Sequence, residues 1–229
     1  MVIETLKDVE YTVKRSNRKT ISIYVERDGT VSILAPKTME DSALSDAVES
    51  KAYIIYKHLA EWEQLNASRI HRQFVNGQSY LYLGRNYRLE FVESQDVPLK
   101  LKNGYFLLKK SEAKNAEKHF IEFYKTKGLP KIKAFVHEFK DKMGVSPNDI
   151  KIMELQNRWG SCTTKGSLNF HWKCIMAPVR TIQYIVVHEL AHLIEMNHSP
   201  AFWKEIDRVF PDYHQDVKWL KEYGASMDL

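Results

Sequence analysis

One short segment near the C-terminal end of the chain limits the possible folds more than any other feature. From residue 184 to residue 194 the side chains are apolar except for those of His188, Glu189 and His192. Such a segment predicts a helix over residues 180–195 that is buried on most sides. Histidine and glutamate are costly inside a buried helix unless a metal ion or a hydrogen-bond network satisfies them. The fold must therefore hold a polar centre within a hydrophobic core.

The spacing of the two histidines predicts a metal site. His188 and His192 are four residues apart, so on a helix their imidazoles lie one turn apart on one face and can reach one ion. Glu189 stands beside them, where a carboxylate can accept a proton from a water molecule that the ion activates. Random placement would give this pattern only about 0.03 times in such a chain. We therefore predict one bound ion, zinc (Zn²⁺) first and other divalent metals as alternatives, with Glu189 as the catalytic base.

A third metal ligand has to come from outside this helix. Catalytic zinc usually takes three protein ligands and leaves a fourth position for water. His198 follows the second histidine by six residues, the metzincin offset, although Glu195 stands where that pattern has glycine. The next residues, Ser199-Pro200, are a helix cap followed by proline at the first helical position, so His198 would lie just before a new helix. We predict His198 as the third ligand, with Glu205 or Asp207 as alternatives.

The first half of the chain has the pattern of strands with a helical insertion. Residues 20–33 alternate apolar and polar side chains around Asp28-Gly29, a strong hairpin signal. Residues 41–65 carry apolar side chains at helical spacing and predict one long helix or two. Residues 80–108 again alternate, with a turn at Asn103-Gly104. We expect an N-terminal β-rich domain over residues 1–110, with a small antiparallel sheet and a helical segment.

The second half predicts helices around a short pair of strands. A helical stripe begins near residue 111 and is expected to be interrupted near residues 128–130, which contain glycine and proline. Residues 150–163 and 167–174 are predicted as two strands that lead into the metal helix. The expected fold class is α+β, with a C-terminal metal-binding catalytic domain over residues 111–229.

Composition excludes several classes of protein. A chain of 229 residues can bury its own core, and Cys162 and Cys174 are too few for a disulfide framework. The longest apolar run ends at His188, far short of the roughly 20 residues of a membrane span. We expect a cytoplasmic protein with no membrane partner. The net charge of +5 is a mild excess spread along the chain, so it indicates nucleic-acid binding only weakly.

Several segments outside the metal motif carry a resemblance to a known family. Besides residues 188–192, these segments are residues 15–20, 28–29, 82–87, 156–162, 168–172, 177–178, 197–200 and 202–203. On these residues the chain resembles the YgjP-like family of predicted metal-dependent hydrolases, which is related to the SprT and WLM zincin-type metallopeptidases. The resemblance covers nearly the whole chain.

The resemblance implies a zincin-like metallopeptidase core, in which the metal helix packs under a small sheet whose edge strand lines the cleft. It also supports His198 as the third ligand. On that pattern Asn157, Arg158 and Trp159 would lie on the edge strand and bind an extended peptide by strand addition. Family resemblance leaves the substrate open, since the same fold can serve different chemistries.

Three functions remain open on the sequence alone. The first is a zinc peptidase in which Glu189 moves the proton. The second is a metal-dependent hydrolase of nucleotides, phosphoanhydrides or another small anionic substrate, suggested by the basic residues Arg15, Arg18 and Lys19. The third is a non-catalytic binding module that the metal stabilises.

Three further side chains are candidates for lesser roles. Tyr213 and His214, between the last two expected helices, could stabilise an oxyanion. His171, on the second expected strand, is interpreted as facing solvent.

Overall fold

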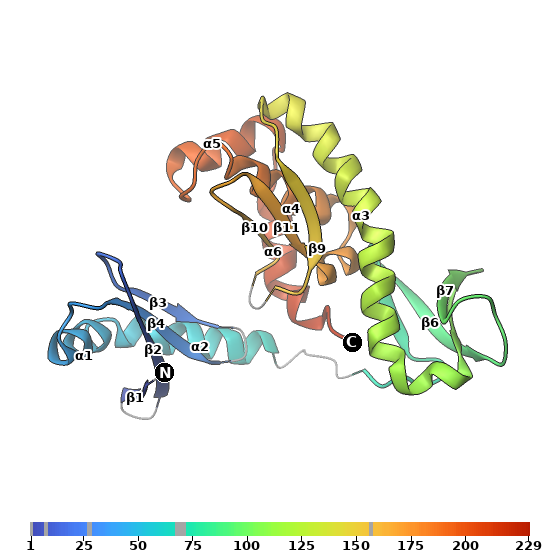
Figure 1. Ribbon diagram of the computed structural model, residues 1–229, viewed down its shortest axis with the longest axis horizontal. Helices are drawn as coiled ribbons and strands as arrows, with labels where there is room; N and C mark the ends of the chain where they lie inside the picture. Colours follow the sequence, from blue (N-terminus) through green and yellow to red (C-terminus); the bar gives the residue numbers. More distant parts are fainter. Residues whose placement is uncertain (1, 7–8, 27–28, 67–71, 156–157) are drawn as a thin grey trace. The chain divides into compact units, whose positions relative to one another are not determined.

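The computed structural model describes residues 2–6, 9–26, 29–66, 72–155 and 158–229. The chain forms two compact units, Met1–Arg69 and Ile70–Leu229, each with its own hydrophobic core (Figure 1). The fold class is α+β, as expected. The division between the units falls earlier than the domain boundary expected near residue 110, so the predicted N-terminal domain is shared between them.

The first unit is a four-stranded sheet packed against two helices. The strands lie in the order β1-β2-β4-β3 and comprise β1 (Val2–Leu6), β2 (Val9–Ser16), β3 (Ser22–Val25) and β4 (Val31–Pro36). The helical spacing of residues 41–65 produces two helices, α1 (Asp41–Glu49) and α2 (Ala52–Asn66). Strands β3 and β4 pair antiparallel, as the hairpin signal predicts, although Asp28 lies outside the described residues.

The second unit begins with another four-stranded sheet. Its strands lie in the order β5-β6-β8-β7 and comprise β5 (Ser79–Tyr82), β6 (Arg85–Val92), β7 (Leu99–Lys102) and β8 (Tyr105–Lys109). This order repeats that of the first sheet, with a parallel pair in the middle of each: β2 with β4, and β6 with β8. The sheets are therefore mixed and not antiparallel as expected. In each case the chain places an intervening strand on the outer edge before it returns in the original direction.

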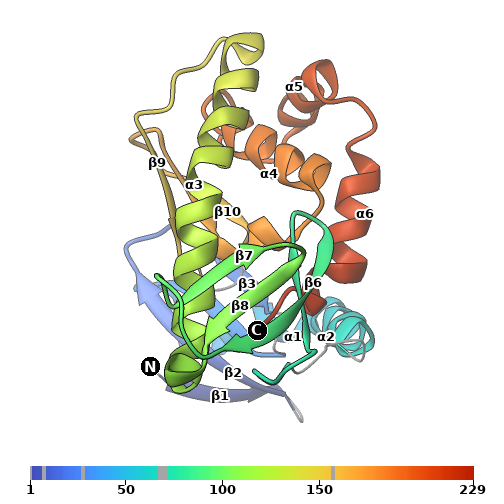
Figure 2. The ribbon, with the colours of Figure 1, turned by 90° about the vertical axis from the view of Figure 1, so that its right-hand side faces the viewer.

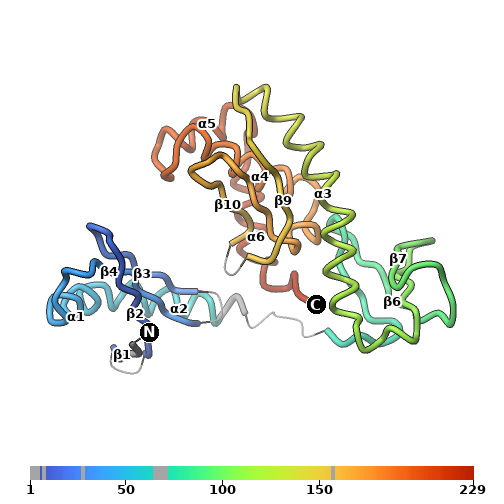
Figure 3. Tube along the Cα trace, in the orientation of Figure 1, coloured from blue at the N-terminus to red at the C-terminus, as the bar shows by residue number. Residues whose placement is uncertain are grey.

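The rest of the second unit is arranged around α4 (Val179–Ala191), the helix that carries His188 and Glu189. After the short helix η1 (Lys110–Asn115) come the long helix α3 (Ala116–Met143) and a three-stranded sheet in the order β10-β11-β9. Those strands are β9 (Asp149–Met153), β10 (Gly160–Cys162) and β11 (Ser167–His171), so the expected single strand over residues 150–163 is two strands with β11 between them. The remaining helices, followed by the trace in Figure 3, are η2 (Trp172–Met176), α4 (Val179–Ala191), α5 (Pro200–Val209), α6 (His214–Tyr223) and η3 (Gly224–Ser226).

Helix α3 joins the two sheets of the second unit (Figure 2). Aromatic side chains of α3 pack against aromatic side chains of the sheet formed by β5 to β8. The ring centroid of Phe120 lies 4.3 Å from that of Tyr80 and 4.9 Å from that of Phe106. The turn between β5 and β6 adds two hydrogen bonds, from the amide of Leu83 to the carbonyl of Ile175 and from Gly84 to Met176. These contacts explain why residues 79–109 belong to the same unit as α4.

The predicted interruption of α3 near residues 128–130 is wrong. The helix continues for 28 residues with Pro130 inside it, and it ends at Gly144 in the left-handed conformation. Gly128 serves close packing instead, because a Cβ atom there would lie 2.5 Å from Cγ1 of Ile175. Among the described residues, no helix is both long enough and apolar enough to cross a membrane.

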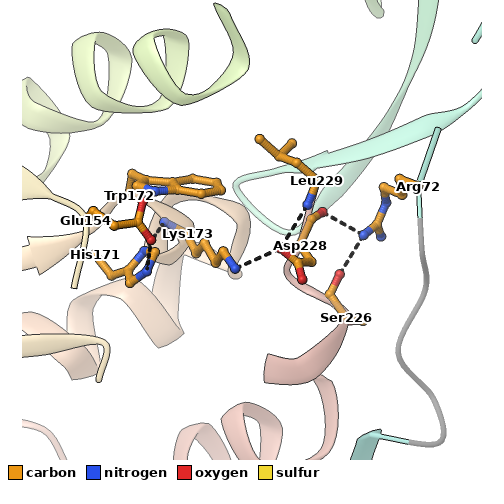
Figure 4. A network of polar contacts seen from close by, with 8 residues as sticks. All are labelled: Arg72, Glu154, His171, Trp172, Lys173, Ser226, Asp228 and Leu229. Atoms are coloured by element: carbon orange, nitrogen blue, oxygen red, sulfur yellow. Dashed lines mark hydrogen bonds and ion pairs between the residues drawn. The ribbon is translucent and has the colours of Figure 1, made fainter. Parts of the chain in front are cut away.

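A polar network fastens the last residues of the chain to the second unit (Figure 4). The Arg72 guanidinium donates hydrogen bonds of 2.8 Å to the carbonyl oxygens of Ser226 and Asp228. The Asp228 carboxylate forms an ion pair of 2.8 Å with Lys173, which belongs to η2. The end of the chain is thereby held beside the helix that precedes α4.

Candidate metal centre

Helix α4 brings the two histidines of the motif to the surface of the core. It ends at Ala191, earlier than expected, and residues 192–194 form a tight turn. His192 nevertheless keeps helical backbone angles, with φ −67° and ψ −14°. Both imidazoles therefore lie on one face, as the spacing predicts, with ring centroids 5.0 Å apart.

The structure brings His198 to this pair. Its ring centroid lies 5.0 Å from that of His188 and 4.8 Å from that of His192, and the ligand atoms of the three rings all lie within 4.8 Å of one another. The Nε2 atoms of His188 and His198 are 3.0 Å apart. Within the described part of the chain, no other group of three histidine, cysteine or acidic side chains converges in this way.

The alternative third ligands are placed elsewhere. Glu205 accepts hydrogen bonds of 3.1 and 2.8 Å from the guanidinium of Arg208, and Asp207 is exposed. Ser199 caps α5 as predicted, because its hydroxyl oxygen accepts a hydrogen bond from the amide of Phe202, and proline begins the helix. This cap turns the chain back so that His198 faces α4.

Hydrogen bonds fix the orientation of the two helical imidazoles. Nδ1 of His192 lies 3.1 Å from the carbonyl oxygen of Glu195, which can only accept, so Nδ1 carries the proton. Nδ1 of His188 lies 3.4 Å from the hydroxyl of Tyr184. Such partners on one ring nitrogen leave the lone pair of Nε2 to face the centre, as in protein metal sites.

Burial lowers the pKa of two of the three imidazoles. It lowers the pKa of His188 to about 3, together with the nearby rings of His192 and His198. Burial also lowers the pKa of His198, assisted by His192. Neutral imidazoles are the form that binds metal, so at neutral pH the site would bind an ion without first losing protons from these two rings.

Phe202 forms a common contact surface for the three histidines. Its side chain is fully buried, and its ring centroid lies 4.9, 4.6 and 4.8 Å from those of His188, His192 and His198. Phe202 was not among the predicted site residues. Its position on the first turn of the capped helix was the available signal.

The side chain of Glu189 extends from α4 toward β10. Its side chain is buried, and within the described residues its Oε2 atom has no hydrogen-bond partner. Burial raises the pKa of Glu189 to about 8, against an opposing effect of Arg158. Gly160 of β10 touches the same carboxyl group, since a Cβ atom on Gly160 would lie 2.5 Å from Oε1 of Glu189. A buried carboxyl group with a raised pKa thus lies on α4 next to His188, one of the three converging histidines.

Comparison with known families bears on the activity of the chain. The family model described as "YgjP-like, metallopeptidase domain" matches residues 19–223. The chain belongs to the YgjP-like family. Membership supports a metal-dependent hydrolase, and the match includes parts of both units. Among proteins with curated descriptions, none matches this YgjP-like chain.

One solved structure is similar to part of this YgjP-like chain. It is the crystal structure of the metallopeptidase zymogen of Pyrococcus abyssi abylysin, with 23% sequence identity and a TM-score of 0.38. The similarity covers 42% of the YgjP-like chain and 99% of the abylysin chain.

The predicted substrate-binding residues of the YgjP-like chain precede the edge strand. Strand β10 begins at Gly160, and Arg158 and Trp159 lie just before it, while Asn157 is outside the described residues. Arg158 is exposed. The carbonyl oxygen of Trp159 accepts hydrogen bonds from the amide of His171, at 2.8 Å, and from the thiol of Cys174, at 3.1 Å. The backbone that leads into β10 is therefore anchored on its inner side.

The interpretation of His171 as solvent-facing is wrong. Its side chain is buried and caps η2, because Nδ1 accepts a hydrogen bond of 3.1 Å from the amide of Lys173 (Figure 4). Nε2 lies 3.2 Å from a carboxylate oxygen of Glu154.

Cys162 and Cys174 are free thiols. Tyr213 is buried next to Trp203, with parallel rings 5.4 Å apart.

Proposed function

We propose that the chain is a zinc-dependent metallopeptidase, in which His188, His192 and His198 hold one zinc ion and Glu189 is the general base. The observation that carries this proposal is the convergence of three imidazoles near a buried carboxyl group, one oxygen of which has no hydrogen-bond partner among the described residues. Three nitrogen donors suit zinc, and a catalytic zinc site has three protein ligands where a closed structural site has four.

The residues at the centre divide the work of hydrolysis. A zinc ion, when bound, supplies a Lewis acid that lowers the pKa of water and polarises a carbonyl group. The three imidazoles hold the ion, and the backbone carbonyl of Glu195 keeps Nε2 of His192 directed toward the centre. Glu189 is buried and His188 and His192 are half-buried, which limits bulk water on this side of the centre and strengthens the electrostatic contacts there, while His198 is exposed.

Glu189 is proposed to move the proton. It accepts a proton from the water whose oxygen bonds to the carbonyl carbon of the substrate, and it returns that proton to the amine nitrogen as the carbon–nitrogen bond breaks. A pKa raised to about 8 suits this exchange, because both protonation states of the carboxyl group are then accessible near neutral pH.

The proposed substrate is an extended peptide, bound along β10. Among the described residues this strand pairs only with β11, and it is the outer strand of its sheet. A free strand edge can pair with an extended chain through main-chain hydrogen bonds. The exposed side chain of Arg158, just before the strand, would then contact an acidic or carbonyl group of the substrate. Arg158 and Trp159 remain proposed substrate contacts, with Asn157 beside them in the sequence.

The alternative of an anionic small-molecule substrate has no support from the basic cluster that suggested it. The Arg15 guanidinium donates hydrogen bonds to the carbonyl oxygens of Pro36 and Met39 and pairs with Asp41. Arg18 donates to the hydroxyl of Ser22. Both guanidinium groups thus form hydrogen bonds within the first unit. No observation favours phosphoanhydrides, nucleic acid or a non-catalytic module over a peptidase.

The test replaces Glu189 by glutamine, which keeps the size of the side chain and removes its basic carboxylate. We expect Glu189→Gln to retain about one zinc ion per chain by elemental analysis and to cleave a peptide library at least about 100-fold more slowly than wild type. The matched control is Glu195→Gln. This glutamate contacts His192 through its backbone carbonyl, which the substitution leaves in place, so the control should cleave like wild type. Equal cleavage by Glu189→Gln and wild type would rule out the proposed base. Zinc-dependent release of phosphate from nucleoside triphosphates, without peptide cleavage, would favour the alternative substrate class.

A further inference from the structure

Four rings form a continuous stack beside the candidate metal centre. Tyr184 of α4 stacks on Tyr213, with centroids 5.9 Å apart and planes 7° from parallel. Tyr213 stacks on Trp203 of α5 at 5.4 Å and 10°, and Trp203 stacks on His198 at 5.8 Å and 25°. The stack therefore begins on the metal helix and ends on the third proposed ligand.

The three histidines differ in what orients them. His188 and His192 each have a hydrogen-bond partner at Nδ1, namely Tyr184 and the carbonyl of Glu195. Within the described part of the chain, the polar contact of His198 is made through Nε2, toward His188. It also lies in a loop whose neighbouring residues 196 and 197 are exposed. Ring contacts with Phe202 and Trp203 must therefore fix the orientation of the third imidazole.

The far end of the stack is anchored to α4 by polar contacts. Arg180 donates a hydrogen bond of 2.9 Å to the carbonyl of Pro211 and pairs at 3.1 Å with the buried carboxylate of Asp216. Thr181 donates to the same carboxylate at 3.0 Å. These bonds hold the segment that carries Tyr213 against the first turn of α4, so Tyr213 supplies a fixed surface on which Trp203 rests.

We infer that Trp203 and Tyr213 are positioning residues that hold His198 in place for metal binding. The stack takes the role for His198 that hydrogen bonds to Nδ1 take for the two helical histidines. Loss of the stack would leave the loop free to turn His198 away, and the site would bind an ion through two imidazoles alone. This inference rests on the proposed function, since it requires that the three histidines bind the metal.

Trp203 could instead stabilise the core without acting through His198, and a double-mutant cycle separates the two roles. The zinc dissociation constant is measured for the purified full chain by competition with a chromophoric chelator. We expect Trp203→Leu and Tyr213→Leu to weaken zinc binding at least about tenfold, as the loss of partners that orient a ligand does. Trp203→Phe keeps a ring that can stack and should restore most of the affinity. The control, Trp219→Leu, changes a half-buried tryptophan that stacks on Tyr223 at 5.4 Å, and it should leave zinc binding within about twofold of wild type.

The same substitutions are then made in a His198→Ala background. There we expect Trp203→Leu to change zinc affinity by less than about twofold, because its effect passes through the missing imidazole. Tyr184→Phe, which removes the hydroxyl next to His188, should weaken zinc binding in both backgrounds. If Trp203→Leu does not fold by circular dichroism, the cycle is completed with Tyr213→Leu.

Two results would overturn the inference while the proposed function stands. One is zinc affinity in Trp203→Leu and Tyr213→Leu equal to that of wild type. The other is an equal loss of affinity with and without His198, which would show that the rings act through general packing. If wild type binds no zinc at all, the inference falls together with the proposed function.

Discussion

The contact between Gly160 and Glu189 ties the proposed base to the edge strand. A single Cβ atom at position 160 would lie 2.5 Å from Oε1 of Glu189, well inside normal contact distance. We therefore expect Gly160→Ala to displace the side chain of Glu189, whose atoms lie nearest to this position, while the three histidines keep their arrangement. Peptide cleavage should fall at least about 100-fold, with zinc content unchanged.

Zinc analysis and peptide-cleavage assays of the same preparation check this expectation. Thr164→Ala, an exposed position in the turn after β10, is the control and should cleave at nearly the wild-type rate. Full activity in Gly160→Ala would mean that Glu189 does not need its observed position.

At the scale of single residues, the relative positions of the proposed central residues could be predicted from the sequence better than those of the residues around them. His188, Glu189 and His192 were predictable because their geometry is set by one helical turn. The stack on His198 depends on Trp203 and Tyr213, which come from different segments, and no local pattern brings their rings together. The contact of Gly160 with Glu189 likewise requires β10 to pass over α4, which is a tertiary event.

At the scale of elements, His171 links η2 to the pH dependence of stability. Burial lowers the pKa of His171, against the opposing carboxylate of Glu154 and with a further lowering by Lys173. As pH falls below about 6.5, the usual value for histidine, the unfolded chain binds a proton that the folded chain resists. The folded state should therefore lose stability between pH 7.5 and 5.

Replacing this residue tests the effect of its ring. His171→Gln removes the titrating group, so urea denaturation should show a smaller loss of stability on acidification than in wild type. The exposed His137→Gln is the control and should follow the wild-type curve. An identical loss in wild type and His171→Gln would contradict the expectation.

Local patterns predicted the helices and hairpins but not the parallel pairings. The spacing of apolar residues predicted α4, and over residues 41–65 it predicted one long helix or two, of which the structure has two. Asn103-Gly104 marked a turn that the structure contains. Hairpin signals report only neighbouring antiparallel strands. The parallel pairs, such as β9 with β11, join strands separated by another strand, so turn residues carry no record of them.

At the scale of the whole molecule, the two units have separate cores, and the proposed centre belongs to one of them. All three histidines, Glu189 and the ring stack lie within residues 70–229. We expect a fragment of residues 70–229 to fold by circular dichroism and to bind zinc within about threefold of the full chain, since no proposed ligand is removed. The full chain measured in the same competition assay is the reference. An unfolded fragment would show that the second core needs the first unit.

The length of β10 limits how the molecule can select its partners. With three residues, this strand offers an incoming chain few main-chain hydrogen bonds. Short edge strands also protect a protein from self-association, because two copies cannot pair over a long register. Because β10 is so short, its main-chain hydrogen bonds would distinguish only weakly between one peptide and another. Discrimination between substrates must therefore arise from side chains on either side of the cut bond.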